Sequence, residues 1–199
     1  MGNLRKKTKN ELDVIRNNLI ILTNKLEKNK INYFLDNGAL LGMYRDKDLI
    51  SWDPDIEISF REDDFIKNKN KIYKIIKNLN FNIIRYDDKN TKIDLQKDFD
   101  WKVIKYTLKV WKLNSKNNFF YRKNFKISSS FFNTSSKIKC FNKNFSCPNN
   151  LEEYLTYLYG NWKVPIKSLD KTKYLSKNYY SVDIFVNVIK MIKKIFKNE

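Results

Sequence analysis

Three carboxylates at alternate positions are the residues of this chain best spaced to do chemistry. Asp53, Asp55 and Glu57 fall within a strand expected over Ser51–Phe60, and successive side chains of a strand point to opposite faces. All three would therefore share one face, while their apolar neighbours point to a core. Like charges this close repel one another, and a divalent cation with oxygen ligands is the usual reason to keep them together. The pattern predicts a Mg²⁺ or Mn²⁺ site, with an exposed acidic strand face as the alternative.

Glycine is scarce, and its placement marks a second feature. The chain has four glycines, and three of them lie in the two segments that carry the candidate chemistry: Gly38, Gly42 and Gly160. The apolar run Ile31–Leu35 leads into a turn expected at Asp36–Gly38. Glycine accepts positive φ and lets a backbone approach a ligand closely. Gly38 is therefore expected to have positive φ or a main chain close to bound phosphates, and Gly42 to allow close packing behind the turn.

The charge balance is strongly basic, with 40 Lys and Arg against 22 Asp and Glu, a net charge of +18. Lys, Asn, Ile, Phe and Tyr abound while Ala, Gly and Arg are scarce, which is typical of an A/T-rich genome. Codon bias therefore explains much of the charge, and dedicated nucleic-acid binding is not favoured. Because arginine suits planar, bidentate recognition of phosphate better than lysine does, Arg45, near the acidic segment, is a candidate phosphate ligand.

Several classes of protein are excluded or disfavoured by composition. The chain has no histidine, which excludes His-based triads, histidine metal clusters and histidine general bases. Its two cysteines are too few for a zinc site of their own. No secretory signal is evident, and no run approaches the ~18 apolar residues of a membrane span. We expect a cytoplasmic protein.

The periodicity of apolar residues predicts an α+β fold in which helices flank a mixed sheet. Helices are expected over Glu11–Lys30 and Glu62–Leu79 and through Tyr159, with Gly160 as a stop; strands over Phe81–Tyr86, Trp101–Leu113 and, as a strand or hairpin, Ile138–Phe145; and a loop over Ser128–Ser136. Length favours one domain over residues 1–199, with its core at about 11–170 and a basic tail at 171–199. A final amphipathic helix, Val182–Phe196, either docks on the domain or lies on an anionic membrane surface.

Two segments carry a resemblance to a known family. The run GALLG at residues 38–42, then Arg45, then LISWDPDIEI at residues 49–58, resembles the signature of the LicD/fukutin family. The run CPNNLEEYL at residues 147–155, followed by YGNW at residues 159–162 and by Pro165, is similar to the family's closing segment. The resemblance implies a nucleotidyltransferase-like fold. It also implies transfer of a phosphorylated group, such as phosphocholine or ribitol phosphate, from a CDP-linked donor to a sugar of a glycan.

The chain departs from the family pattern at two informative positions. Ala39 stands where the family has threonine, which removes a hydroxyl that could meet a phosphate. A later family strand carries a further aspartate, and here Lys109 occupies the acidic position of the run Tyr106–Trp111, with Asp94 as the alternative occupant.

The sequence thus favours a Mg²⁺- or Mn²⁺-dependent transferase. The candidate residues are Asp53, Asp55 and Glu57 for catalysis and the metal, and Gly38, Ala39, Gly42, Arg45 and Lys109 for the substrate. The expected partners are a CDP-linked donor and a glycan or lipid-linked sugar, with peripheral contact at the inner membrane face through the last helix. The alternatives are a nucleotidyltransferase acting on a small molecule or protein, and a catalytically degenerate binding module.

Overall fold

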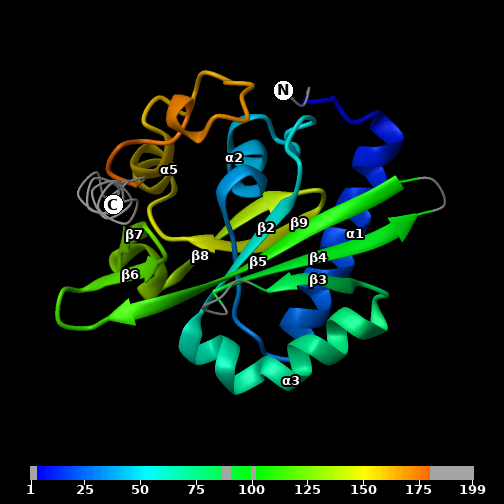
Figure 1. Cartoon of the computed structure of the whole chain (residues 1–199), viewed down its shortest axis with the longest axis horizontal. Coiled ribbons are helices and arrows are strands. Elements are labelled where there is room, and N and C mark those ends of the chain that lie inside the picture. Colours follow the sequence, from blue (N-terminus) through cyan, green and yellow to red (C-terminus); the bar gives the residue numbers. More distant parts are fainter. Residues whose placement is uncertain (1–3, 87–90, 100–101, 180–199) are drawn as a thin grey trace, which may run out of the picture.

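The computed structural model describes residues 4–86, 91–99 and 102–179 (Figure 1). Its large sheet contains β1 (Phe34–Leu35), β2 (Ile56–Arg61), β3 (Asn82–Tyr86), β4 (Lys92–Phe99), β5 (Lys102–Asn114), β6 (Phe119–Arg122) and β7 (Phe125–Ser128). Five of these strands run in the order β1-β2-β5-β4-β3, and β6 pairs with the far end of β5 and with β7. Only the β2–β5 pair is parallel among the described strands. The sheet is therefore mixed, as expected.

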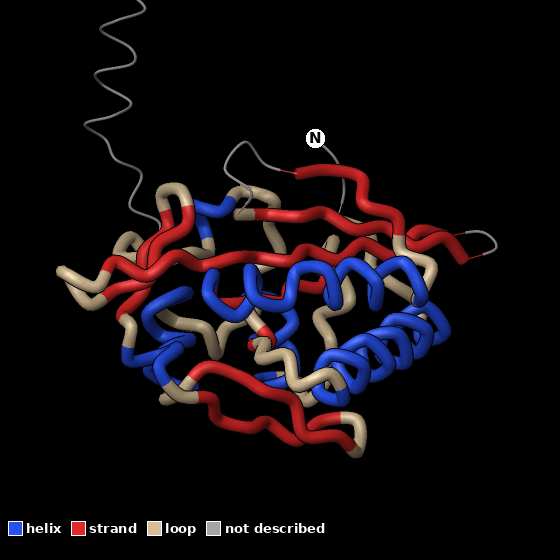
Figure 2. Tube along the Cα trace, turned by 90° about the horizontal axis from the view of Figure 1, so that it is seen from below, coloured by secondary structure: helices blue, strands red, loops and turns tan. Residues whose placement is uncertain are grey.

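Helices cover this sheet, and a hairpin forms a second, smaller one. The helices are α1 (Lys9–Lys28), α2 (Asn37–Arg45), α3 (Glu62–Asn78), α4 (Ser130–Asn133), α5 (Leu151–Tyr159) and a short 3-10 helix, η1 (Lys171–Lys173). The hairpin pairs β8 (Ser135–Cys140) with β9 (Lys143–Pro148). Figure 2 shows the hairpin on the opposite side of the molecule from the large sheet, with helices between them. The expected α+β fold is confirmed.

The first helix illustrates how local sequence sets the packing. Thr8 caps α1, its hydroxyl accepting from the Glu11 N–H while the Glu11 carboxylate accepts from the Thr8 N–H. This reciprocal pair satisfies two N–H groups that the helix leaves unpaired. The apolar stripe of α1 is buried against the sheet, where the Tyr106 hydroxyl donates to the Ile15 carbonyl at 3.2 Å. The apolar face of β5 is thereby fixed toward α1, and the polar face of β5 is turned the other way.

A buried carboxylate ties together the elements around that polar face. Asp36 is fully buried at the start of α2 and accepts from the Asn37 N–H at 2.7 Å, the Ser59 hydroxyl at 2.5 Å and the Tyr154 hydroxyl at 2.5 Å. Trp111 Nε1 in turn donates to the Ser59 oxygen at 3.1 Å. Because a buried charge is costly unless it is hydrogen-bonded, this network holds α2, β2, β5 and α5 in one arrangement.

Two expectations for the motif region are wrong. The segment Asp36–Gly38 is not a free turn, because Asp36 caps α2 and Gly38 lies in its first turn. Asn37, rather than Gly38, has positive φ, at 45°. The strand expected from Ser51 begins only at Ile56. Pro54 has no N–H for a ladder, and the Asp53 N–H instead donates to the Ile50 carbonyl at 3.1 Å in a turn.

Other predictions fare unevenly. The expected helices and strands over Glu11–Lys30, Glu62–Leu79, Phe81–Tyr86 and up to Tyr159 are confirmed with small shifts at their ends, and Gly160 ends α5 with φ 63°. The expected loop Ser128–Ser136 is wrong in part, since it contains α4 and the start of β8. The final helix Val182–Phe196 lies outside the described residues. Among the described helices, none has the length and apolar character needed to cross a membrane.

Gly42 has the close-packing role expected for it, and this generates a test of the fold. A Cβ at this position would lie 2.5 Å from the Asp48 carbonyl oxygen and 2.9 Å from the Ile50 nitrogen. Gly→Ala in a helix normally stabilises it by up to ~1 kcal/mol, whereas overpacking costs about 1–3 kcal/mol. We expect the clash to win, so that Gly42→Ala lowers the free energy of unfolding in urea. An unchanged or raised urea midpoint would show that residues 48–50 move to accommodate the added methyl group without cost.

Candidate functional site

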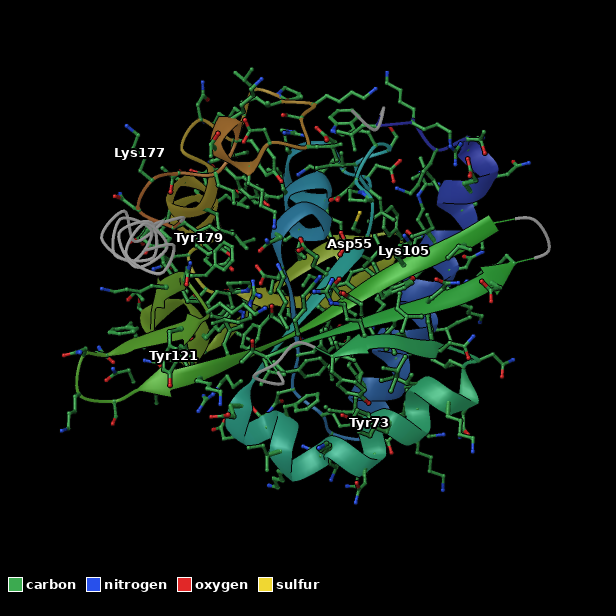
Figure 3. The ribbon with its side chains drawn as sticks, in the orientation of Figure 1. Asp55, Tyr73, Lys105, Tyr121, Lys177 and Tyr179 are labelled. Atoms are coloured by element: carbon green, nitrogen blue, oxygen red, sulfur yellow. The ribbon has the colours of Figure 1, made fainter. Side chains whose placement is uncertain are left out.

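One cavity of about 450 Å³ contains most of the candidate residues. Its walls come from the start of α2, the loop before β2, strand β5, the β6–β7 hairpin and the segment that follows α5. The side chains that carry charge on its walls are Arg45, Asp53, Asp55, Glu57, Lys92, Lys109, Arg122, Lys123 and Lys171. Figure 3 places Asp55 near the centre of the molecule, beside the strand that carries Lys105. The cavity thus combines an acidic cluster with several cations.

The three carboxylates meet in this cavity by a route that differs from the one expected. Only Glu57 lies on β2, whereas Asp53 and Asp55 belong to the loop that precedes it. The expectation that one strand face presents all three is therefore wrong, because the turn before Pro54 replaces the start of that strand. All three nevertheless line the same cavity.

Gly38 brings α2 against this acidic cluster. Its N–H donates to Glu57 Oε2 at 3.3 Å, and a Cβ built on it would lie 1.6 Å from Asp53 Oδ2. Glycine is thus required by the close approach of the Asp53 carboxylate and not by positive φ. The expectation that the Gly38 N–H faces bound phosphates differs from this arrangement, since that N–H already has a carboxylate acceptor.

Crowding perturbs the acids. Burial raises the pKa of Asp53 well above its ordinary value, and the charges of Glu57 and Asp55 raise it further, while Lys7 opposes them. Burial also raises the pKa of Glu57, and the nearby Lys109 ammonium works against that rise. Burial and the neighbouring carboxylates therefore both disfavour the charged forms of Asp53 and Glu57.

Lys109 is a cation that pairs with a carboxylate of the cluster. Its side chain is only 3% exposed, and its Nζ lies 2.5 Å from Glu57 Oε1. The parallel register of β2 and β5 sets Lys109 opposite Ser59, and Thr107 opposite Glu57. The Lys109 and Glu57 side chains therefore meet across adjacent strands. Lys109 therefore occupies the later-strand position facing the acidic cluster.

Asp94 lies one strand further away, on β4, and the Thr107 hydroxyl lies between it and Asp55. Asp94 pairs with Lys92 at 2.8 Å, and Thr107 Oγ1 lies 2.9 Å from Asp94 Oδ1 and 2.5 Å from Asp55 Oδ2. A hydroxyl has one proton, so it cannot donate to both carboxylates at once. Thr107 therefore donates to only one of the two carboxylates, and the Lys92 ammonium already offsets the charge of Asp94. Thr107 was missed from sequence, although strand alternation places it on the same face as Lys109.

The remaining predicted residues have supporting positions. Arg45 lines the cavity, but it makes two 2.7 Å contacts to the Asp46 carboxylate and donates to the Trp162 carbonyl at 3.2 Å. It thereby fixes the segment after α5 against α2. Ala39 is buried in the core, and Gly42 packs against residues 48–50. Neither residue lines the large cavity.

Further cavity residues come from the Lys-rich segment that follows α5. Tyr174 and Lys171 line the cavity from this segment, next to Tyr159 at the end of α5. Burial, followed by the charges of Glu57, Asp53 and Asp55, raises the pKa of Tyr174 to about 12. The neutral phenol is thus held against the acidic cluster. No sequence signal places these distant residues beside the motif.

The acidic cluster fits a cation that is shared with a substrate. Within the described residues, no three acidic or cysteine side chains converge as a complete protein-only metal site. Mg²⁺, however, commonly takes one or two protein carboxylates and completes its shell with substrate phosphates and water. Asp53 and Asp55 suit that role, since they line the cavity and, in the part of the chain described, an ion pair is found for Glu57 but for neither of them.

The comparison with protein families agrees with the motif. The model of the LicD/FKTN/FKRP family, nucleotidyltransferase domain, matches residues 30–150, more than half of the chain. No curated protein gives a significant match. The matched region contains Asp53, Asp55, Glu57 and Lys109 and ends before the cavity residues that follow α5.

The raised pKa of Asp53 predicts how stability depends on pH. A raised carboxyl pKa means that the native state binds more protons than the unfolded state, so stability falls as pH rises from about 3.8 through the native pKa. Asp53→Asn should remove this loss in metal-free protein, gaining about 1.4 kcal/mol per unit of pKa shift at pH 8 and little near pH 4. Urea unfolding at the two pH values measures the difference.

The exposed Asp98, on β4, provides a control for this experiment. Asp98→Asn should change stability little at either pH. An Asp53→Asn variant no more stable at pH 8 than at pH 4, relative to wild type, would show that Asp53 is not strained by its neighbours.

The Lys109–Glu57 pair predicts competition with divalent cations. Lys109→Met removes the ammonium and leaves Glu57 without its partner, a change that typically costs about 3–5 kcal/mol when the pair is buried. Mg²⁺ or Mn²⁺ should compensate, so calorimetry should show at least tenfold tighter metal binding than in wild type. Lys105→Met removes the same charge from an exposed position of β5 and should leave affinity unchanged. Equal affinities for all three proteins would place the metal away from Glu57.

Proposed function

The chain belongs to the LicD/FKTN/FKRP family, and from this premise we propose that it is a metal-dependent transferase that moves a phosphorylated group from a CDP-linked donor to a sugar. The family match indicates a phosphotransferase-like function in general terms. The observation that carries the specific proposal is the position of Asp53, Asp55 and Glu57 on a cavity that also presents Arg and Lys side chains. A metal–diphosphate has the charges that such a site complements.

The charged and aromatic side chains that line the cavity support a nucleotide-diphosphate donor. Its diphosphate would lie between the acidic cluster with its cation and the basic side chains, as phosphoryl-transfer sites commonly arrange them. Trp52, Tyr159 and Tyr174 supply aromatic surface on the same walls. These rings suit a pyrimidine or ribose, whereas the acidic end suits the reacting phosphates. Phosphocholine and a polyol phosphate are the transferred groups that the family resemblance favours.

Asp53 and Asp55 would hold Mg²⁺ or Mn²⁺ together with the donor phosphates, and Glu57 would join them where Lys109 releases it. When bound, the metal supplies charge neutralisation on the leaving nucleotide phosphate. The chain's own contribution is to keep the carboxylates in place. Gly38 donates to Glu57, and the Thr107 hydroxyl lies between Asp55 and Asp94.

The transfer itself needs a base for the acceptor. The acceptor hydroxyl oxygen forms a bond to phosphorus, the bond from phosphorus to the nucleotide phosphate breaks, and the hydroxyl proton leaves. We assign that proton to the carboxylate oxygen of Asp53 that the metal does not occupy, because Asp53 lines the cavity where the acceptor would bind. Asp94 lies behind Thr107 and pairs with Lys92, which favours a positioning role.

The acceptor in this proposal is a glycan or lipid-linked sugar, reached at the inner face of a membrane. This part rests on the family resemblance and on the basic, amphipathic C-terminal sequence. The competing function is a catalytically degenerate member that binds ligand without turnover, and the Lys109–Glu57 ion pair specifically favours it.

A donor panel tests the proposal. We expect CDP-choline or CDP-ribitol with Mg²⁺ to release CMP in the presence of a sugar acceptor, and ATP to release no pyrophosphate. Asp55→Asn should lower CMP release by at least about 10²-fold at an unchanged melting temperature, because it removes a charge that acts on the reacting phosphates. The matched control Asp98→Asn should keep full activity. CMP release and liquid chromatography of the nucleotides provide the measurement.

Two outcomes would contradict the proposal. Pyrophosphate release from ATP with AMP attached to the acceptor, and no reaction of CDP-linked donors, would favour a nucleotidyltransferase. Tight CDP binding without turnover for either donor class, in protein that binds Mg²⁺ normally, would favour the degenerate binding module.

A further inference from the structure

Arg122 is a buried arginine whose charge the described protein leaves without a carboxylate. It ends β6, is 5% exposed and lines the cavity. Its Nε is buried and has no hydrogen-bond partner. The guanidinium instead lies between two aromatic rings, with Cζ 5.3 Å from the centre of Trp111 and 4.9 Å from that of Phe125. An unsatisfied donor in a buried guanidinium is costly, so this position calls for an acceptor.

The hairpin geometry explains why the guanidinium is fixed at the cavity. Arg122 pairs directly with Phe125 across a two-residue turn in which Lys123 has φ 54°. A tight turn of this kind fixes the register of both strands. The Phe125 ring therefore stays beside the Arg122 guanidinium. This contact keeps the guanidinium at the cavity.

A second cation reaches the same place from a distant part of the chain. Lys171 Nζ lies 5.9 Å from the centre of the Phe125 ring that Arg122 also contacts. Burial lowers the pKa of Lys171, and the charges of Lys109, Arg122 and Lys92 lower it further. Lys109 and Lys92 have carboxylate partners in Glu57 and Asp94. Among the ion pairs of the described residues, none compensates Arg122 or Lys171.

We propose that Arg122 and Lys171 form a binding subsite for a phosphate group, separate from the carboxylates that face the metal. Two cations that lack an ion pair match the charge of a phosphate dianion, and a rigid guanidinium fork offers it paired hydrogen bonds. The substrate class rests on the proposed transferase function, but the subsite itself rests on these two side chains. Its phosphate belongs either to the donor or to a phosphorylated acceptor.

A purely structural role for Arg122 is the competing explanation. Stacking between two rings accounts for the position of the guanidinium, but it leaves Nε without an acceptor and does not account for Lys171. The two explanations differ in what a variant loses. Stacking alone predicts a loss of stability, whereas a phosphate subsite predicts a loss of affinity.

Inorganic phosphate provides the direct probe. Titration of the full chain in metal-free buffer, followed by calorimetry, should show saturable binding that acetate does not compete for at equal concentration. Arg122→Gln should weaken phosphate at least tenfold and Lys171→Gln several-fold. Arg122→Lys, which keeps the charge without the fork, should be intermediate and guards against misfolding of the Gln variant. Arg85→Gln removes an exposed arginine from β3 and should bind as wild type does.

Saturating CDP with Mg²⁺ separates the two sources. Phosphate that still binds beside CDP belongs to an acceptor site, whereas displacement by CDP, together with weaker CDP binding in Arg122→Gln, assigns it to the donor. The proposal is overturned if phosphate does not saturate, if acetate competes equally, or if folded Arg122→Gln and Lys171→Gln bind phosphate as Arg85→Gln does. Because no turnover is measured, a failure of the transferase assay leaves this result independent.

Discussion

Crowding of negative charge beside the first turn of α2 is the constraint on which the site depends. Asp53, Asp55 and Glu57 line one cavity, and each is accommodated differently. Glu57 has the Lys109 ammonium at 2.5 Å and the Gly38 N–H at 3.3 Å, and Asp55 has the Thr107 hydroxyl at 2.5 Å. The pKa of Asp53 is raised well above its ordinary value by burial and by the charges of Glu57 and Asp55. A helix N-terminus favours nearby anions only modestly, so in the proposed function a cation bound with the donor would offset the remaining repulsion.

The rest of the fold keeps this arrangement from relaxing. Asp36 is buried beneath the cluster and accepts three hydrogen bonds from α2, β2 and α5, so the elements cannot separate without exposing or unpairing a charge. Gly38 and Gly42 permit approaches that any side chain would block. Arg45 then joins α2 to the segment after α5 through the Trp162 carbonyl. Residues 160–175 thereby become a wall of the cavity.

The sequence predicted the fold class and the gathering of the acids, but not how they gather. Asp-Asn-Gly is a strong turn signal, yet the Asp36 side chain caps a helix because Ser59 and Tyr154 complete its hydrogen bonds. Pro54 has no N–H for a strand ladder, so β2 starts later than the alternation of carboxylates suggested. Lys109 was placed through the family resemblance, with Asp94 left open as the alternative occupant. Arg122 and Lys171 could not, because a hairpin and a distant 3-10 helix bring them together, and no local pattern encodes that contact.

In the proposed mechanism, the protein's aspartates and the donor's phosphates share one cation. Electron–nuclear double resonance of Mn²⁺ bound with CDP, in protein carrying ¹³C-labelled aspartate carboxylates, tests this most directly. A shared cation should give couplings of the same Mn²⁺ to both ³¹P and ¹³C. Coupling to ³¹P without ¹³C would mean that the nucleotide alone carries the ion, and it would contradict a metal site at Asp53 and Asp55.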